Sequence, residues 1–351
     1  MRNQDGVNRN EEKQRILCIY LQRELKLCIY ICRMSYKVLA LGDSWFHYPN
    51  SLDRNGKLVA GGFWNKLLRA VGISEHKGVG NIIKYLASNH NVNLTYSEKT
   101  FSEIFDATFH IMNSADDVLG CCGEELLLMV YGYRRKDPSV IVHTYTWLDM
   151  LIERISAHAN EYDKFVILLS AGGNDITADN LVDFLYDANN ADGPVNKQAI
   201  NKAVNEQMRA AYQEIFKRIC TTFPTKNFHF LFHGYAYPPV NGRGVFTELE
   251  HSSIQLLHKL SPGPWLQPGF VQEKIAPRSA QEEIIGNFID MFNSMLASLQ
   301  SSFPNGNLHY IDLRNVTDKI SRDKGWCNEL HFDSTTYPQA SKKYYEVIQK
   351  L

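Results

Sequence analysis

The chain has 351 residues, of which 44% are hydrophobic and 21% charged, and its formal net charge is -1. These values are ordinary for a soluble globular protein with a sizeable core. The near-zero charge supplies no basic face for nucleic acid, so we expect no nucleic-acid partner.

The N-terminal 33 residues differ in composition from the rest of the chain. They begin polar and then carry two apolar patches, at 16–21 and 27–32, which charged residues separate. Neither patch supplies a transmembrane segment of about 20 residues or the core of a signal peptide. We therefore read 1–33 as an extension, either an interfacial or partner-binding helix or the product of a misplaced start ahead of Met34. Residues 34–351 are predicted to form the folded domain.

The seven cysteines are odd in number and include no Cys-x-x-Cys pair. A disulfide scaffold and a structural zinc site are therefore not expected. Together with the lack of a clean signal peptide, this pattern favours a reducing compartment, and we predict a cytoplasmic protein.

Short apolar runs typical of strands alternate along the chain with longer helical patterns. The runs lie at 36–41, 108–112, 165–170, 228–233 and 307–312, and the helical patterns lie near 62–71, 143–158, 197–221, 279–300 and 335–350. Such alternation predicts an α/β fold, with a five-stranded parallel sheet covered by helices on both faces and right-handed crossovers.

Four segments rich in Gly, Pro, Asn and aromatic residues interrupt this pattern, at 48–62, 97–107, 176–196 and 234–278. Long irregular insertions in a compact α/β domain are usually substrate-side loops. We therefore predict one domain whose loop insertions form a cap over the site.

Ser44 lies where the first apolar run stops, in the sequence Gly-Asp-Ser-Trp at 42–45. A buried strand ending there would deliver the serine to the carboxyl edge of a parallel sheet, where ligands bind in such folds. Ester hydrolysis by a serine needs a base within hydrogen-bond reach and donors for the developing oxyanion. Taken alone, however, Gly-Asp-Ser is also ordinary turn or helix N-cap chemistry.

Two later segments could supply those groups. Asn174 follows the run 165–170 through a Gly-Gly turn, and its amide can donate to an oxyanion, although it could equally form an Asx turn. His331 lies in a polar turn between the last apolar run and the last helical pattern. That turn lies at the same edge of the predicted sheet as Ser44, which makes His331 the candidate base.

The three segments, in this order, resemble the GDSL-type, or SGNH, hydrolase superfamily and its bacterial members. The motifs that carry the resemblance are Gly-Asp-Ser-Trp-Phe at 42–46, Gly-Gly-Asn-Asp at 172–175 and Trp-Cys-Asn-Glu-Leu-His at 326–331, within a match from about 36 to 351. The resemblance implies a flavodoxin-like three-layer α/β/α sandwich that cleaves esters through an acyl-enzyme without a metal or other cofactor. Its substrate would be a small-molecule, lipid or acylated-sugar ester.

Carried over by position, Ser44 resembles the nucleophile and His331 the general base. The side chain of Asn174 and the backbone N–H of Ser44 resemble the oxyanion donors. The residues that we expect to line the substrate cleft are Trp45, Gly173 and Tyr235. Packing under the cap would explain the aromatic residues among them equally well.

The residue that would orient His331 departs from the family pattern. Many members have an aspartate three residues before the histidine, where this chain has Asn328. An asparagine can accept a hydrogen bond from the imidazole and fix its tautomer, but it cannot stabilise imidazolium by charge. Asn328 is therefore our candidate, and Glu329 and Asp333 are possible substitutes.

A second departure concerns the glycine whose backbone N–H serves as an oxyanion donor after the family's second strand. The segment 110–117, which begins within the predicted second strand, holds no glycine, and the next glycine along the chain is Gly120. Because the donor is a main-chain group, the N–H of Ala115 or of Asp116 could take its place.

Other functions compete with ester hydrolysis. Metal-dependent phosphoester hydrolysis would need several carboxylates and histidines converging on a metal, a pattern that the early strands do not offer. A nucleotide-binding module is weakly supported, because Gly78-Val79-Gly80 has no preceding strand and no third glycine. The main alternative is a non-catalytic ligand- or glycan-binding protein on the same fold, since fold does not fix function.

Overall fold

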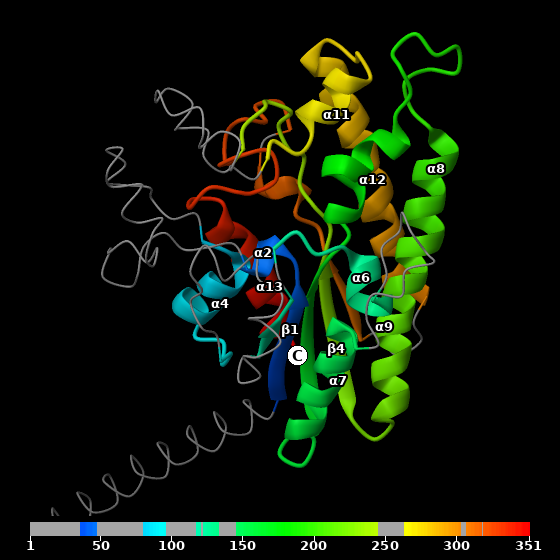
Figure 1. Cartoon of the computed structure of the whole chain (residues 1–351). Helices are drawn as coiled ribbons and strands as arrows, with labels where there is room; N and C mark the ends of the chain where they lie inside the picture. Colours follow the sequence, from blue (N-terminus) through cyan, green and yellow to red (C-terminus); the bar gives the residue numbers. More distant parts are fainter. Residues whose placement is uncertain are drawn as a thin grey trace, which may run out of the picture.

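A computed structural model describes the residues 36–47, 80–95, 117–120, 122–132, 145–244, 263–302, 307–317 and 319–351 (Figure 1). The extension 1–33, the predicted helix 62–71 and the predicted strand 108–112 lie outside these ranges.

A parallel sheet with the strand order β2-β1-β3-β4-β5 forms the centre of the described chain. Its strands are β1 (Tyr36–Gly42), β2 (Val118–Leu119), β3 (Lys164–Ser170), β4 (Asn227–His233) and β5 (Leu308–Ile311). The predicted five-stranded parallel sheet is confirmed, and four of its strands lie at the predicted positions. The strand that pairs with the outer side of β1 is Val118–Leu119.

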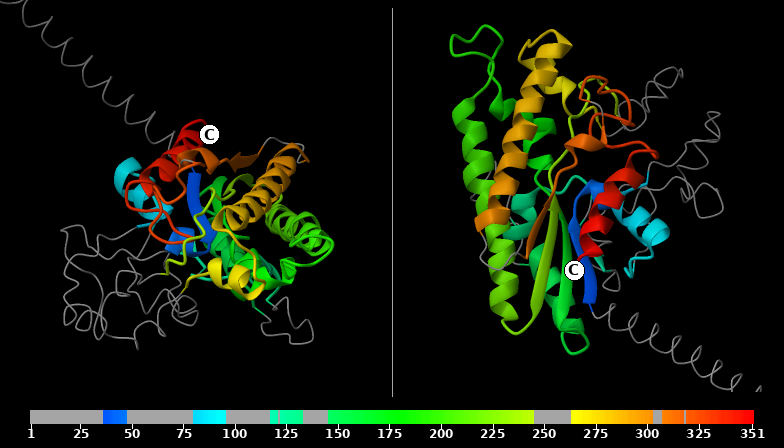
Figure 2. Two further views of the ribbon diagram at one scale, coloured as in Figure 1. Left: turned by 90° about the horizontal axis from the view of Figure 1, so that it is seen from above. Right: turned by 180° about the vertical axis from the view of Figure 1, so that it is seen from behind.

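Helices cover both faces of the sheet, as predicted (Figures 1 and 2). One face carries α4 (Ile82–His90) and α13 (Tyr337–Ile348). The other carries α6 (Leu126–Tyr131), α7 (Trp147–His158), α8 (Lys197–Asn201), α9 (Arg209–Thr222) and α12 (Arg278–Ser302), with a π-helical stretch at Lys202–Met208 joining α8 to α9. No helix in the described ranges is both long and apolar enough to cross a membrane.

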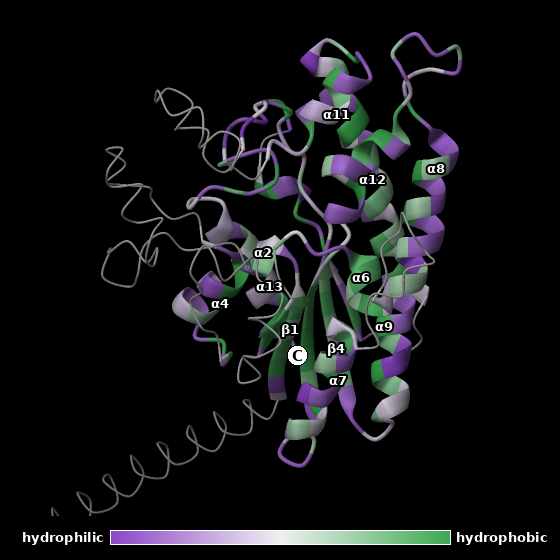
Figure 3. Ribbon diagram, in the orientation of Figure 1, coloured by the Kyte–Doolittle hydropathy of each residue, from purple (hydrophilic) through white to green (hydrophobic). Residues whose placement is uncertain are grey.

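The hydropathy of the elements accounts for this layering. Because both faces of the sheet are covered, its strands are apolar almost throughout, and every residue of β3 after Lys164 is buried. The helices are apolar toward the sheet and polar outside (Figure 3). Local signals fix where helices begin. At α7, Thr146 and Asp149 form a reciprocal capping box, which typically stabilises a helix start by about 1 kcal/mol.

The carboxyl ends of the central strands lie together and carry the polar motifs of the sequence. Gly42 at the end of β1 pairs with Ser170 at the end of β3, and β4 ends beside them at His233. Above this edge lie two parts of the predicted insertions. They contain a 3-10 helix, Ala178–Phe184, and the short helix α11 (Gln267–Gln272), which sequence patterns did not predict.

Candidate active site

Ser44 opens the short helix α2 (Ser44–His47) directly after β1. The preceding residue, Asp43, caps this helix. Its backbone carbonyl accepts the N–H groups of Phe46 and His47, and its carboxyl Oδ1 accepts the N–H of Trp45 at 3.0 Å. The helix turns the Ser44 hydroxyl toward His331, whose Nε2 lies 2.7 Å from Ser44 Oγ. The first and last segments of the sequence resemblance therefore meet in space.

Asn328 determines which nitrogen of His331 carries the proton. Its Oδ1 accepts the backbone N–H groups of Leu330 and His331, each at 2.9 Å. Because an N–H only donates, these two bonds fix the oxygen, and not the amide nitrogen, toward the ring. Nδ1 of His331, 3.0 Å from the same oxygen, must then carry the proton. Nε2 is left with its lone pair facing the Ser44 hydroxyl, which is the tautomer that a general base needs.

Burial lowers the pKa of His331 to about 3. The ring is 3% exposed, and a desolvated imidazole loses stability when it becomes charged. Asn328 is fully buried and brings no negative charge to compensate. The histidine is therefore neutral, and able to accept a proton, throughout the neutral range.

The two alternative orienting residues serve other purposes. The carboxylate of Glu329 accepts the backbone N–H groups of Gly242, Trp265, Leu266 and Gln267, at distances of 2.7 to 3.2 Å for the shortest contact with each. It thus binds the start of α11 to the turn that carries His331. Asp333 accepts the N–H groups of Thr335 and Thr336 just before α13. Neither carboxylate bonds to the imidazole in the contacts observed.

Asn174 and Asp175 anchor the segment that follows β2. One N–H of the Asn174 amide donates to the carbonyl oxygen of Glu124 at 2.9 Å. Asp175 accepts the N–H of Leu126 at 2.8 Å, which caps α6. Asn174 also lines the same pocket as Ser44. Its second amide N–H is the group that could donate to a substrate oxygen there.

Gly120 occupies the place where the family's glycine was expected. The predicted second strand, 108–112, lies outside the described residues, and the strand observed beside β1 is Val118–Leu119. The observed β2 ends at Leu119, so a glycine does follow it directly. A side chain could not fit at Gly120, because its φ is +107° and a Cβ atom would lie 2.0 Å from the carbonyl oxygen of Gly42. This close approach puts Gly120 beside the end of β1. The two donors predicted from the sequence, Ala115 and Asp116, lie outside the described residues.

A hydrogen-bonded network of three buried side chains, Asp43, Ser170 and His233, lies behind Ser44 and joins the ends of β1, β3 and β4. Ser170 Oγ is 2.7 Å from Asp43 Oδ1 and 2.9 Å from His233 Nε2. His233 Nδ1 is in turn 3.0 Å from the carbonyl oxygen of Gly234. None of Asp43, Ser170 and His233 is more than 1% exposed. Sequence patterns did not predict this network, although Ser170 and His233 are polar residues at the ends of apolar strands.

The contacts among Asp43, Ser170 and His233 require one more hydrogen than these groups carry when Asp43 is ionised and His233 is neutral. A carbonyl oxygen only accepts, so His233 Nδ1 carries a proton and Nε2 of the neutral ring is an acceptor. Both contacts of Ser170 need a hydrogen, but its hydroxyl has only one. With Ser170 donating to Asp43, the contact of Ser170 with His233 lacks a hydrogen until Asp43 or His233 takes up a proton. Burial raises the pKa of Asp43 to about 6 and lowers that of His233 to about 4, so Asp43 is the first of the two groups to take up a proton as the pH falls.

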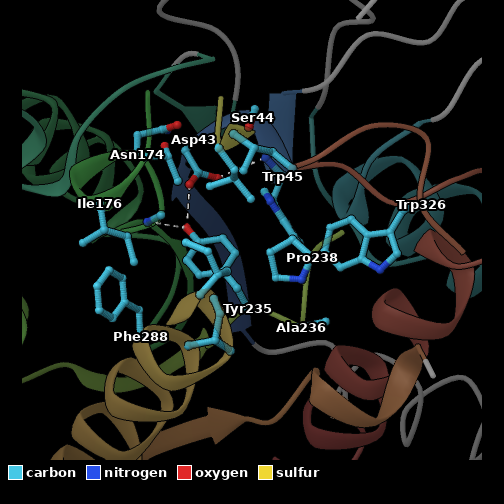
Figure 4. Close-up of a pocket in the computed structure, with 16 residues that line it drawn as sticks. Asp43, Ser44, Trp45, Asn174, Ile176, Tyr235, Ala236, Pro238, Phe288 and Trp326 are labelled. Carbon is cyan, nitrogen blue, oxygen red and sulfur yellow. Dashed lines mark hydrogen bonds between the residues drawn. The ribbon is translucent and has the colours of Figure 1, made fainter. Parts of the chain in front are cut away.

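Tyr235 connects this network to the glycine turn after β3. Its hydroxyl donates to Asp43 Oδ2 at 2.6 Å and accepts the N–H of Gly173 at 3.1 Å. A Cβ atom on Gly173 would lie 2.8 Å from the Tyr235 ring, so only glycine fits there. The tyrosine hydroxyl is thus turned inward, and the ring is what faces the pocket (Figure 4).

A pocket opens beside Ser44 and encloses about 520 Å³ of space between protein atoms, part of it open to solvent (Figure 4). The structure places all three residues expected to line the cleft along this pocket, namely Trp45, Gly173 and Tyr235. Trp45 is only 3% exposed and also packs edge-on against Phe332, with ring centroids 4.6 Å apart. It therefore belongs to the core as much as to the pocket wall.

Comparison with known proteins gives likeness of fold only. No protein-family model matches the chain, and none of the curated proteins matches it significantly. Among solved structures, the chain is similar to a lipase from a goat rumen metagenome (13% identity, TM-score 0.40, covering 88% of this chain and 95% of that one). It is also similar to an extracellular lipase from Streptomyces rimosus (14%, 0.38, 89% and 98%) and an acetyl xylan esterase from Geobacillus stearothermophilus (9%, 0.32, 90% and 94%). At these identities and TM-scores the likeness says nothing about activity, which has to be inferred from the site itself.

Proposed function

We propose that the protein is a serine ester hydrolase of the SGNH type, with Ser44 as nucleophile and His331 as general base. The observation that carries the proposal is the continuous chain from Asn328 through His331 to the Ser44 hydroxyl, in which every proton is assigned by its neighbours. It lies at the carboxyl edge of the sheet and beside a pocket, where such chemistry takes place in α/β folds.

The reaction would proceed in two halves. Ser44 Oγ attacks the ester carbonyl carbon while its proton passes to His331 Nε2. The tetrahedral intermediate collapses, the C–O bond to the alcohol breaks, and the alcohol leaves with the proton from His331. Water then attacks the acyl-serine, giving one proton to His331, and the carboxylic acid is released as that proton returns to Ser44.

The oxyanion would be stabilised by three N–H groups. They are the backbone N–H of Ser44, the second amide N–H of Asn174 and the backbone N–H of Gly120. A neutral orienting residue makes these donors more important, because Asn328 offers no charge to the imidazolium that forms together with the oxyanion.

Hydrolysis of p-nitrophenyl acetate by purified protein tests this function. We expect turnover by the wild type and a loss of kcat of at least about 10³-fold in Ser44→Ala and in His331→Ala, since the two residues act as a unit. Ser294→Ala, which removes an exposed serine hydroxyl from α12, is the matched control and should retain full activity. If the wild type cleaves no ester, the chain is instead a binding protein on this fold. If Ser44→Ala keeps the wild-type rate, Ser44 is not the nucleophile and the proposed mechanism fails.

A further inference from the structure

The wall of the pocket away from Ser44 is apolar and comes largely from one helix. Ile285, Phe288 and Ile289 on α12 line it, together with Leu266 just before α11. The spacing of three and four residues puts the α12 side chains on one face of the helix. Each of these side chains is at most 6% exposed. The far wall is therefore a continuous hydrocarbon surface fixed in the core.

Among the described residues that line the pocket, most of those with polar side chains lie near Ser44. Asp43 and the hydroxyl of Tyr235 are bonded to one another, which leaves Ser44 and Asn174 to meet a ligand. The remaining wall has two further side chains with polar atoms. They are Thr177, which is 7% exposed, and Trp326, whose indole N–H is buried and has no hydrogen-bond partner among the described residues. A sugar ring needs several hydrogen-bond partners to leave water, whereas an alkyl chain needs none. The pocket thus suits an alkyl chain.

The position of the pocket also indicates whether it binds the acyl part or the alcohol part of an ester. Its lining includes Ser44, Asn174 and Leu330, but not the neighbouring His331 itself. The alcohol oxygen takes its proton from His331 Nε2 as it leaves, so the alcohol lies on the histidine side of the reacting carbon. The acyl group is the arm bonded to Ser44, and it extends from the carbon whose oxygen would face Asn174.

We propose that this pocket is an acyl-binding site, and that the preferred substrates are esters of unbranched fatty acids longer than acetate. The proposal rests on the ester-hydrolase function proposed above and adds to it the arm of the substrate that is recognised and its chemical class. Ile285 and its neighbours on α12 set the length of chain that fits.

Two ester series test the proposal. In p-nitrophenyl esters from acetate to dodecanoate, kcat/KM should rise about fourfold for each methylene until the pocket is full, as expected for about 0.8 kcal/mol per buried CH₂. In acetate esters of alcohols of the same lengths, the rise should be much smaller. A flat acyl series, or a rise in the alcohol series alone, overturns the acyl site while leaving the esterase in place. If no ester in either series is cleaved, the proposed function itself fails.

Two isoleucines that are adjacent on α12 provide a matched pair of variants. Both are buried, but only Ile285 lines the pocket, whereas Ile284 packs in the core. Ile285→Ala should increase the ratio of octanoate to butyrate kcat/KM at least threefold, and Ile284→Ala should leave this ratio within twofold of the wild type. Ile285→Phe fills the space and should lower the ratio, so a failure of one variant to fold leaves the other as a test. Equal ratios in the Ile285 and Ile284 variants would overturn the role of α12.

Discussion

Replacing Asn328 by aspartate should change the pKa of His331 in a direction that the geometry fixes. The new carboxylate would keep the two backbone N–H donors and the bond to Nδ1, all within 3.0 Å. It would add a negative charge about 4 Å from the ring centre, worth up to about 4 kcal/mol at an effective dielectric constant of about 20. Since about 1.36 kcal/mol corresponds to one pKa unit, a rise of about 1 to 3 units is expected.

The assay is the pH dependence of kcat/KM, which reports the ionisation of the free enzyme. Because the pKa of His331 is lowered to about 3, the base stays neutral well below pH 6.5, and the wild type should show equal kcat/KM at pH 5 and pH 8. In Asn328→Asp the acid limb should move up to between about pH 4 and 6, with a higher rate at pH 8 because the imidazolium is stabilised. Asn190→Asp, on an exposed loop, is the charge control. The reasoning would be refuted if kcat/KM of the wild type fell with a midpoint near pH 6.5, or if this midpoint did not rise in Asn328→Asp.

Three further outcomes are expected. Asn174→Ala should lower kcat about 10²- to 10³-fold with little change in KM, because its amide is needed for the oxyanion more than for the substrate; an equal loss through KM alone would contradict this. Glu329→Gln should lower the free energy of unfolding in urea by about 1–3 kcal/mol, because an NH₂ group replaces one of the two acceptor oxygens that the buried backbone N–H groups share. The exposed Glu283→Gln should leave this free energy unchanged. The folded protein holds His233 and His331 neutral, so the unfolded chain binds more protons below pH 6.5 and stability should fall as the pH is lowered toward 4. His331→Gln should reduce that slope by up to about 1.4 kcal/mol per pH unit, and an unchanged slope would argue against a buried neutral ring.

The layout of the sheet could be predicted because four of its strands are long apolar runs. Strands buried on both faces leave a continuous signal, as in β3 and β4. The strand β2 has two residues, which is too short for any periodicity, and this is why the second strand was predicted elsewhere. Because the second strand was predicted at 108–112, a glycine was sought before Gly120, which directly follows β2.

The residues of the candidate site could be named from the sequence, but the hydrogen bonds between them could not. Ser44, Asn174 and His331 follow predicted strands, and the carboxyl edge of a parallel sheet brings such residues together. Which group orients the histidine depends on where side chains point within one tight turn. There Asn328 faces the ring and Glu329, one residue later, faces the opposite way toward the start of α11. Sequence adjacency carries no information about that choice.

Covalent labelling of the nucleophile tests the central claim most directly. A fluorophosphonate that reacts with an activated serine should add one phosphonyl group per chain, and peptide mass spectrometry should place it on Ser44. Labelling should be lost in Ser44→Ala and fall at least about 10²-fold in rate in His331→Ala. A wild-type protein that stays unlabelled, or a label on any other residue, would contradict the assignment of Ser44 and His331 as a working pair.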